Sequence, residues 1–233
     1  MNMDMQVETA ELAKKVMAIQ NNISKVIVGK EAVFQKLMAA FLAGGNVLLE
    51  DMPGTGKTKL AKALAASLDA AFGRIQFTPD LLPSDVTGLN IFRQDKGAFE
   101  FTPGPVFCNI LLADEINRAT PRTQSSLLEC MEEKQVTVDG VTRSMARPFF
   151  LIATQNPVET TGTYPLPEAQ IDRFAMQLSM GYPTMQEELM IIDRYQTEDP
   201  LEELKPVCSC EEILQMQRLC RQVYVSDGVR KYL

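Results

Sequence analysis

Histidine is absent from this chain of 233 residues, and cysteine occurs only five times. Without histidine, the chain cannot form a Ser-His or Cys-His catalytic pair or a histidine-bound metal site on its own. An odd number of cysteines in a chain of this length does not indicate a disulfide framework, so reduced thiols are expected. The three late cysteines, Cys208, Cys210 and Cys220, are too irregularly spaced to predict a zinc site.

Long apolar runs are also missing. No stretch approaches the roughly 18 uninterrupted apolar residues that cross a bilayer, and the N-terminus lacks the basic and apolar segments of a targeting signal. We therefore expect no membrane span and a cytoplasmic protein. The net charge of −7 argues against a general nucleic-acid surface, so proteins are the expected partners. With 45% hydrophobic residues, the chain is expected to bury a sizeable core in one or two domains.

Short apolar runs of strand length alternate with amphipathic segments over most of the chain. Strands are expected at 46–50, 110–113 and 149–153, and helices at 8–22, 31–42, 58–68 and 122–132. The strand runs are apolar on both faces, as a parallel sheet requires. The turn Asp139-Gly140 predicts a hairpin over 135–142, and a second hairpin is expected between 89 and 101.

The pattern changes near residue 182, beyond which only helices are expected, at 185–195 and 210–224. The sequence therefore predicts an α/β core with a parallel sheet and two inserted hairpins over 1–181. A helical unit is expected over 182–233.

A glycine-rich loop follows the first expected strand, with the sequence Pro53-Gly54-Thr55-Gly56-Lys57-Thr58. In a phosphate-binding loop, backbone N–H groups face the anion, the lysine reaches the β- and γ-phosphates, and the next hydroxyl binds Mg²⁺. Asp51 stands where the usual pattern begins with glycine, which leaves the entry geometry of the loop open. The alternative, a glycine-rich turn that only caps a helix, does not explain the strand before and the helix after.

Two acidic residues, Asp114 and Glu115, directly follow the expected strand 110–113. An ATP-hydrolysing site needs one acid for the Mg²⁺ shell and one that orients the attacking water. We expect Asp114 to address the metal and Glu115 to polarise the water. The alternative is a pair of acids on a solvated loop, which the upstream phosphate loop disfavours.

Two further polar residues lie near strand ends. Asn156 follows the strand 149–153 and is expected to hydrogen-bond the water or the γ-phosphate, with a turn-forming Asn-Pro as the alternative. Arg173 is a candidate transition-state cation, with a surface ion pair to Asp172 as the alternative.

Five stretches of the chain resemble the MoxR family of AAA+ ATPases. They are, in order, VGKE (28–31), LLEDMPGTGKT (48–58), LADEINR (112–118), ATQNP (153–157) and PLPEAQIDRF (165–174). The resemblance implies an AAA+ core with strand order 5-1-4-3-2, a helix-2 insert near 89–101 and a hairpin before sensor 1 near 136–143. It also implies a helical lid over 182–233, which we expect to be incomplete at residue 233, so that no sensor-2 arginine can be assigned.

The same resemblance implies roles for individual residues. Asn156 would be sensor 1, Val28 and Gly29 would border the adenine, and Arg173 would be an arginine finger that reaches the γ-phosphate of a neighbouring subunit. Such a finger acts only in an oligomer, and the family suggests a homo-oligomeric ring of six copies. Lys57, Glu115, Asn156 and Arg173 are then the expected catalytic residues, and ATP and Mg²⁺ the expected cofactors.

The resemblance further implies chaperone-like remodelling of a protein client. By family analogy, one candidate client is a metal-binding protein with a von Willebrand A-type domain. A second hypothesis is an ATP-gated assembly module that turns over negligibly because its lid is incomplete. A third is a DNA motor, for which Arg143 and Arg147 near the second hairpin would be the contacts, but the acidic balance counts against it.

Overall fold

The computed structural model describes residues 3–52, 54–157, 162–196 and 199–232, with side chains from residue 9 onward. Its centre is a parallel sheet in the order β2-β5-β8-β1-β9. The strands are β1 (Val47–Glu50), β2 (Phe72–Gln76), β5 (Ile110–Asp114), β8 (Phe150–Gln155) and β9 (Met176–Leu178). Counted without the hairpins, this order is the expected 5-1-4-3-2 read from the other edge, so the fold prediction is confirmed.

Both faces of the three central strands are buried, which explains their uninterrupted apolar sequences. Along β5, Ile110 and Leu112 join one core cluster and Leu111 and Ala113 join the other. Strands β1 and β8 alternate in the same way. A strand pattern of this kind needs helices on both sides of the sheet.

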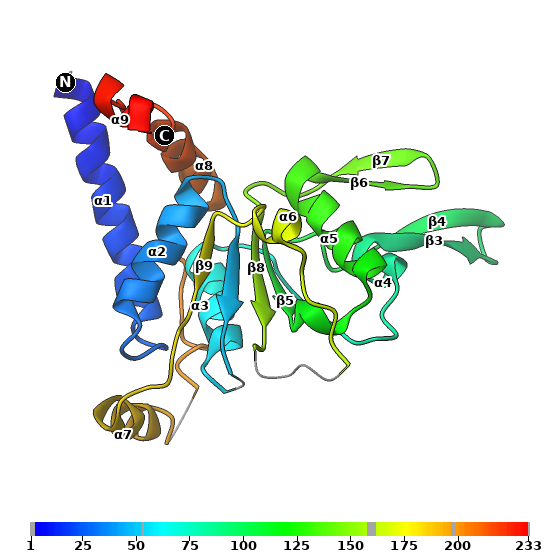
Figure 1. The fold of residues 1–233 in the computed structure, drawn as a ribbon, viewed down its shortest axis with the longest axis horizontal. Coiled ribbons are helices and arrows are strands. Elements are labelled where there is room, and N and C mark those ends of the chain that lie inside the picture. The colour runs from blue at the N-terminus through cyan, green and yellow to red at the C-terminus, as the bar shows by residue number, and fades with distance from the viewer. Residues whose placement is uncertain (1–2, 53, 158–161, 197–198, 233) are drawn as a thin grey trace.

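Helices cover both faces (Figure 1). Residues of α1 (Met3–Ile23), α2 (Glu31–Leu42), α3 (Lys57–Ser67) and α8 (Cys210–Cys220) form the first cluster with one face. The second cluster contains residues of α4 (Pro83–Thr87), η1 (Ile116–Arg118) and α5 (Pro121–Glu133). The short helix α6 (Glu168–Ile171) precedes β9.

Two antiparallel hairpins project from the core side by side (Figure 1). They are β3 (Gly88–Arg93) with β4 (Ala98–Pro103), and β6 (Gln135–Val138) with β7 (Val141–Ser144). Asn90 Nδ2 donates to Asp139 Oδ2 at 2.6 Å, and the Arg143 guanidinium carbon lies 3.9 Å from the centroid of the Phe101 ring. These contacts join the two hairpins to each other.

The C-terminal helices differ in how they attach. The helix α7 (Met185–Arg194) is tied to the turn after α1, because Arg194 donates to Ser24 O at 2.6 Å and Tyr195 donates to Val26 O at 3.0 Å. In contrast, α8 packs on α2, where Gln217 Nε2 donates to Phe41 O at 2.8 Å. The last helix is α9 (Asp227–Tyr232). The division at residues 181 and 182 stays a prediction.

Two helix boundaries differ from the sequence-based expectation by more than two residues. The helix expected over 8–22 already begins at Met3. The helix expected over 210–224 ends at Cys220, and Val223 and Tyr224 beyond it are exposed. Across the described ranges, the structure contains no helix that is both long and apolar enough to cross a membrane.

Candidate functional site

The glycine-rich loop connects β1 to α3, as the sequence predicts. Gly54 and Gly56 have φ of 86° and 88°, in the left-handed region that glycine adopts without steric penalty. Among the described residues, and apart from those next to each glycine in the chain, no heavy atom lies within 4 Å of where a Cβ on either glycine would be. The loop therefore presents backbone N–H groups and the N-terminus of α3 to open space, as anion binding requires.

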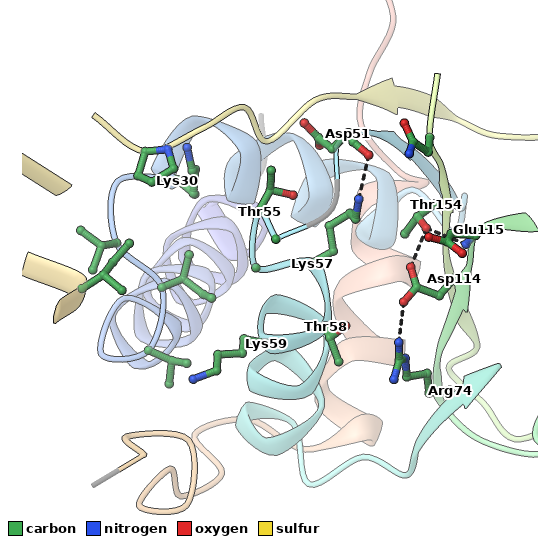
Figure 2. A pocket seen from close by; sticks show the side chains of 18 of the residues that line it. Lys30, Asp51, Thr55, Lys57, Thr58, Lys59, Arg74, Asp114, Glu115 and Thr154 are labelled. Carbon is green, nitrogen blue, oxygen red and sulfur yellow. Dashed lines mark hydrogen bonds and ion pairs between the residues drawn. The ribbon is translucent and has the colours of Figure 1, made fainter. Parts of the chain in front are cut away.

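The Lys57 side chain folds back over this loop (Figure 2). Its Nζ donates to the carbonyl oxygens of Asp51 at 2.9 Å and Met52 at 3.0 Å. These bonds hold the ammonium group beside the place where the loop would hold phosphates. Pro53, which the sequence also assigns to the nucleotide, lies outside the described residues.

Asp51 anchors the entry of the loop. The residue is only 5% exposed, and its carboxylate accepts hydrogen bonds from Ser179 Oγ at 2.9 Å, Met180 N–H at 2.6 Å and Gly181 N–H at 3.0 Å. The donors belong to the segment that leads from β9 towards α7. The departure from glycine at this position thus fixes the loop entry to the chain that precedes α7.

The carboxylate of Asp114 lies between two side chains from neighbouring strands (Figure 2). Its Oδ1 accepts from Thr154 Oγ1 of β8 at 2.7 Å, and its Oδ2 accepts from Arg74 Nη2 of β2 at 2.8 Å. Strands β2, β5 and β8 are adjacent in the sheet, so their carboxyl ends bring these groups together. The Arg74 guanidinium therefore places a positive charge beside the Asp114 carboxylate. Together with the Thr58 hydroxyl, this carboxylate offers the hard oxygen donors that suit Mg²⁺.

Glu115 is held by its backbone and by two donors. Its φ of 57° and ψ of 50° lie in the left-handed region, and its N–H donates to Thr154 Oγ1 at 2.9 Å. Its Oε2 accepts from Gln76 Nε2 at 2.8 Å and from Arg118 Nη1 at 2.9 Å. The second acid of the pair thus has a fixed place next to Asp114.

A cavity of about 580 Å³ joins these groups, a size typical of small-molecule sites. Most residues that the sequence assigns to the site line it: Val28, Gly54, Thr55, Gly56, Lys57, Thr58, Asp114, Glu115 and Asn156. Asn156, just past β8, is 8% exposed. Gly29 is not among the lining residues, and the Glu187 side chain of α7 fills the space beside it.

One end of the cavity is formed by side chains that sequence reasoning missed. Ile191 and Tyr195 from the α7 region line the cavity together with Val26 and Ile27, and Lys59 Nζ lies 3.5 Å from the centroid of the Tyr195 ring. These apolar and aromatic groups suit a flat nucleobase. The resemblance pointed to Val28 and Gly29 beside the adenine, but no local pattern indicated Ile191 or Tyr195, because they are far from those residues in the chain.

Arg173 lies in a different place. Its Nε is 3.4 Å from Glu132 Oε2, and its side chain is 41% exposed. It lines a smaller cavity of about 210 Å³ together with Gly45 and Asn46, which precede β1. The phosphate loop follows β1, so Arg173 and the Lys57 cavity lie at opposite ends of that strand. The alternative considered from the sequence was a surface ion pair with Asp172, whereas the structure pairs Arg173 with Glu132.

Comparison with known proteins agrees with this geometry. Residues 46–176 match the family model described as "ATPase family associated with various cellular activities (AAA)". The chain is 54% identical to the "Uncharacterized protein YeaC" of Bacillus subtilis, with 91% of this chain and 66% of that protein covered. It is 42% identical to "Chaperone MoxR1" of Mycobacterium tuberculosis, with 91% of this chain and 55% of that protein covered.

A solved structure is also similar. The crystal structure of a "putative ATPase" from Cytophaga hutchinsonii superposes with a TM-score of 0.88 at 42% identity, covering 98% of this chain and 71% of that one. The chain spans about half to two thirds of the length of the curated relatives that it matches most strongly. From the matched domain, the phosphate loop and the strand order together, we conclude that the chain belongs to the MoxR family of AAA+ ATPases.

Proposed function

We propose that this chain binds ATP with Mg²⁺ in the cavity around Lys57 and hydrolyses it as part of an oligomer. The observation that carries the proposal is that Lys57, Asp114 and Glu115 line one cavity at the carboxyl end of the sheet. Open α/β sheets bind their ligands at this end of the strands. The family match supports nucleotide binding.

Each residue has a distinct role in the proposed reaction. Lys57 and the loop N–H groups hold the β- and γ-phosphates, and Thr58 and Asp114 hold Mg²⁺, which neutralises phosphate charge when bound. Glu115 orients the water that attacks the γ-phosphate in line, and Asn156 contacts that water or the γ-phosphate. The Asp114 carboxylate forms an ion pair with the Arg74 guanidinium. Binding of Mg²⁺ to Asp114 would therefore replace one positive partner by another.

Arg173 would complete the site of a neighbouring copy. Its position at the far end of β1 from the Lys57 cavity supports a role between subunits instead of within one. An arginine supplied from outside stabilises the charge of the transition state by roughly 10³–10⁵ in rate. A ring of six copies, as in the family, would place one such arginine at every interface.

The proposed purpose is the remodelling of a protein client. One relative carries the name "Chaperone MoxR1", which supports this purpose. The hairpin β3–β4 also exposes two aromatic side chains, Phe92 and Phe99, and Phe99 is 72% exposed. Exposed aromatic side chains of this kind suit a protein partner. By family analogy, a metal-binding protein with a von Willebrand A-type domain is one candidate. A DNA motor has less support, because the Arg143 guanidinium stacks on Phe101 of the other hairpin.

Steady-state phosphate release tests the enzyme proposal. The chain and its Glu115→Gln variant are compared with Mg²⁺ and ATP, and binding of a fluorescent ATP analogue is measured in parallel. We expect both proteins to bind the analogue and only the unaltered chain to release phosphate above background. Equal background release from both would favour the alternative, an ATP-gated assembly module without turnover.

A further inference from the structure

A second cavity, of about 480 Å³, lies at the end of the sheet opposite to the phosphate loop. Gly44, which lines it, precedes β1, and Phe149, which also lines it, precedes β8. Its other side is formed by α8. The cavity is therefore separate from the Lys57 cavity, which forms where these strands end.

Four cationic side chains line this second cavity: Lys134, Arg147, Arg218 and Arg221. Over the described part of the chain, none of its lining residues is acidic. This concentration is unusual for a chain with 23 basic and 30 acidic residues. Four like charges around one hollow repel each other, and such an arrangement is stabilised when an anion enters.

The four cations lack acidic partners of their own. Among the described residues, every ion pair of the chain involves other lysines and arginines. Glu132, next to the cavity, pairs with Arg173, and Glu212 on the same helix as Arg218 pairs with Lys15. These two nearby acids are thus engaged with other cations.

Lys134 is the most constrained of the four. Its Nζ is buried and, within the described residues, has no hydrogen-bond partner, although it lies 5.1 Å from the centroid of the Phe149 ring. Burial, and then the neighbouring Arg147, lower the pKa of this amine to about 8. A buried ammonium without a hydrogen bond is costly, so an arriving acceptor would relieve that cost.

We propose that the cavity between Lys134, Arg147, Arg218 and Arg221 binds an anion that carries several phosphate groups. A single carboxylate brings one negative charge, whereas each phosphate group brings up to about two at neutral pH. Guanidinium groups also match phosphate oxygens with two parallel hydrogen bonds, and three of the four cations are arginines. Phe149 and Leu214 add apolar side chains to the lining of the cavity.

Two sources could supply such phosphates. One is a free oligophosphate or nucleotide. The other is the nucleotide of a neighbouring copy, since Lys134 and Gly44 also line the smaller cavity that holds Arg173. The second source rests on the proposed oligomer, whereas the first does not.

Calorimetric titration with inorganic tripolyphosphate at low ionic strength tests the site. All proteins carry Lys57→Ala, which removes the lysine of the phosphate loop and keeps the test independent of the proposed ATPase. We expect binding to this background and a loss of about tenfold or more in affinity when Arg147→Ala and Arg221→Ala are added. Both arginines are exposed residues, so the fold should tolerate their replacement.

The matched control adds Arg230→Ala and Lys231→Ala on α9, which remove the same charge away from the cavity. We expect it to bind tripolyphosphate like the background. Absence of binding, or equal loss in both double variants, would overturn the site. Tighter binding of a poly-glutamate peptide than of tripolyphosphate would overturn the phosphate assignment.

Sedimentation with ATP then separates the two sources in the chain with Lys57 intact. Loss of ATP-dependent association on Arg147→Ala and Arg221→Ala would assign the phosphates to a neighbouring nucleotide. Unchanged association, together with tripolyphosphate binding in the Lys57→Ala background, would assign them to a free ligand. Either result supports the site.

Discussion

Asp51 shows how one residue can connect the phosphate loop to a distant part of the chain. Its carboxylate accepts three hydrogen bonds from 179–181, and its backbone carbonyl accepts one from Lys57. In Asp51→Gly the side-chain acceptor is lost, and the N–H groups of Met180 and Gly181 lose their partner. Leaving such donors unpaired costs about 1–3 kcal/mol each. We expect the midpoint of thermal unfolding to fall by about 5 °C or more.

Nucleotide binding should weaken in the same variant, because the loop entry is no longer held. Titration with a fluorescent ADP analogue measures this effect. The control is Ser179→Ala, which removes one donor but keeps the carboxylate and its two backbone partners. Unchanged stability and affinity in Asp51→Gly would show that the anchor is unimportant.

Single residues were predictable from sequence where their chemistry depends on neighbours along the chain. The glycines, Lys57 and Thr58 lie in one loop, and Asp114 and Glu115 directly follow one apolar strand. In contrast, Arg74, Gln76 and Tyr195 reach the site only through strand order and the placement of α7. No local pattern distinguishes them from other polar or aromatic residues, so sequence reasoning missed them.

At the scale of elements, sequence patterns overlooked both edge strands of the sheet, β9 and β2, and β2 is the one that reaches the acids of the site. It lies at the sheet edge and only Ile75 is fully buried, so its sequence lacks the apolar run of a central strand. The central strands were predicted because helices bury both of their faces. The edge strand nevertheless carries two side chains that contact the acids of the site, Arg74 and Gln76.

Gln76 should matter for turnover more than for binding. It aligns with Asp114 in the β2–β5 register and donates to Glu115 Oε2 at 2.8 Å. In Gln76→Leu, Glu115 Oε2 loses one of its two hydrogen-bond donors and keeps only the bond from Arg118. The carboxylate is then expected to orient water less accurately. We expect kcat for ATP to fall about tenfold, with KM changed by less than about twofold. Phosphate release at varied ATP concentration measures both.

A control for Gln76 is available on the hairpin β3–β4, away from β2. Lys96→Ala, on the exposed turn between β3 and β4, changes a surface ion pair with Glu100 far from the acids. It should leave kcat and KM unaltered. A proportional rise in KM with unchanged kcat in Gln76→Leu would contradict the positioning role.

The attachment of α8 should depend on pH through Glu212. A hydrogen bond from Lys15, followed by one from the Ser209 N–H, lowers the pKa of this carboxyl to about 2. The unfolded value is about 4.3, so the stabilisation is complete above that pH and is lost as pH falls towards 2. Because the pair is partly exposed, we expect Glu212→Gln to cost at most about 1 kcal/mol at pH 7.

Urea unfolding of both proteins at pH 7, 5 and about 3.5 tests this expectation. The difference in unfolding free energy should shrink as the pH falls, since glutamine retains the cap at Ser209 but not the ion pair. Glu211→Gln, the exposed neighbour, is the matched control and should show little difference at any pH. A difference that grows at low pH would contradict the assigned role.

At the scale of the whole molecule, the groups of the proposed reaction lie at two opposite ends of the sheet. The acids and the phosphate loop lie at the carboxyl end, whereas Arg173 and the cationic cavity lie at the other end. The sequence suggested an arginine finger by resemblance, but only the strand arrangement places Arg173 far from the Lys57 cavity. If Arg173 acts as proposed, the site is complete only between copies of the chain.

Mixing two inactive variants tests this division. In Arg173→Ala, each copy keeps Glu115 but offers no arginine to its neighbour. In Glu115→Gln, each copy lacks the acid but still offers Arg173 to its neighbour. Each variant alone should lose roughly 10³-fold or more in phosphate release. In an equal mixture, about a quarter of the interfaces should combine an intact Glu115 with an intact Arg173, and activity should return.

The control mixture replaces Glu115→Gln by the double variant Glu115→Gln/Arg173→Ala, which supplies neither group. No interface in that mixture is complete, so phosphate release should stay at background. Recovery only in the first mixture requires that Glu115 and Arg173 act on one ATP from two different copies. Full activity of Arg173→Ala on its own would instead mean that the chain completes its site without this arginine.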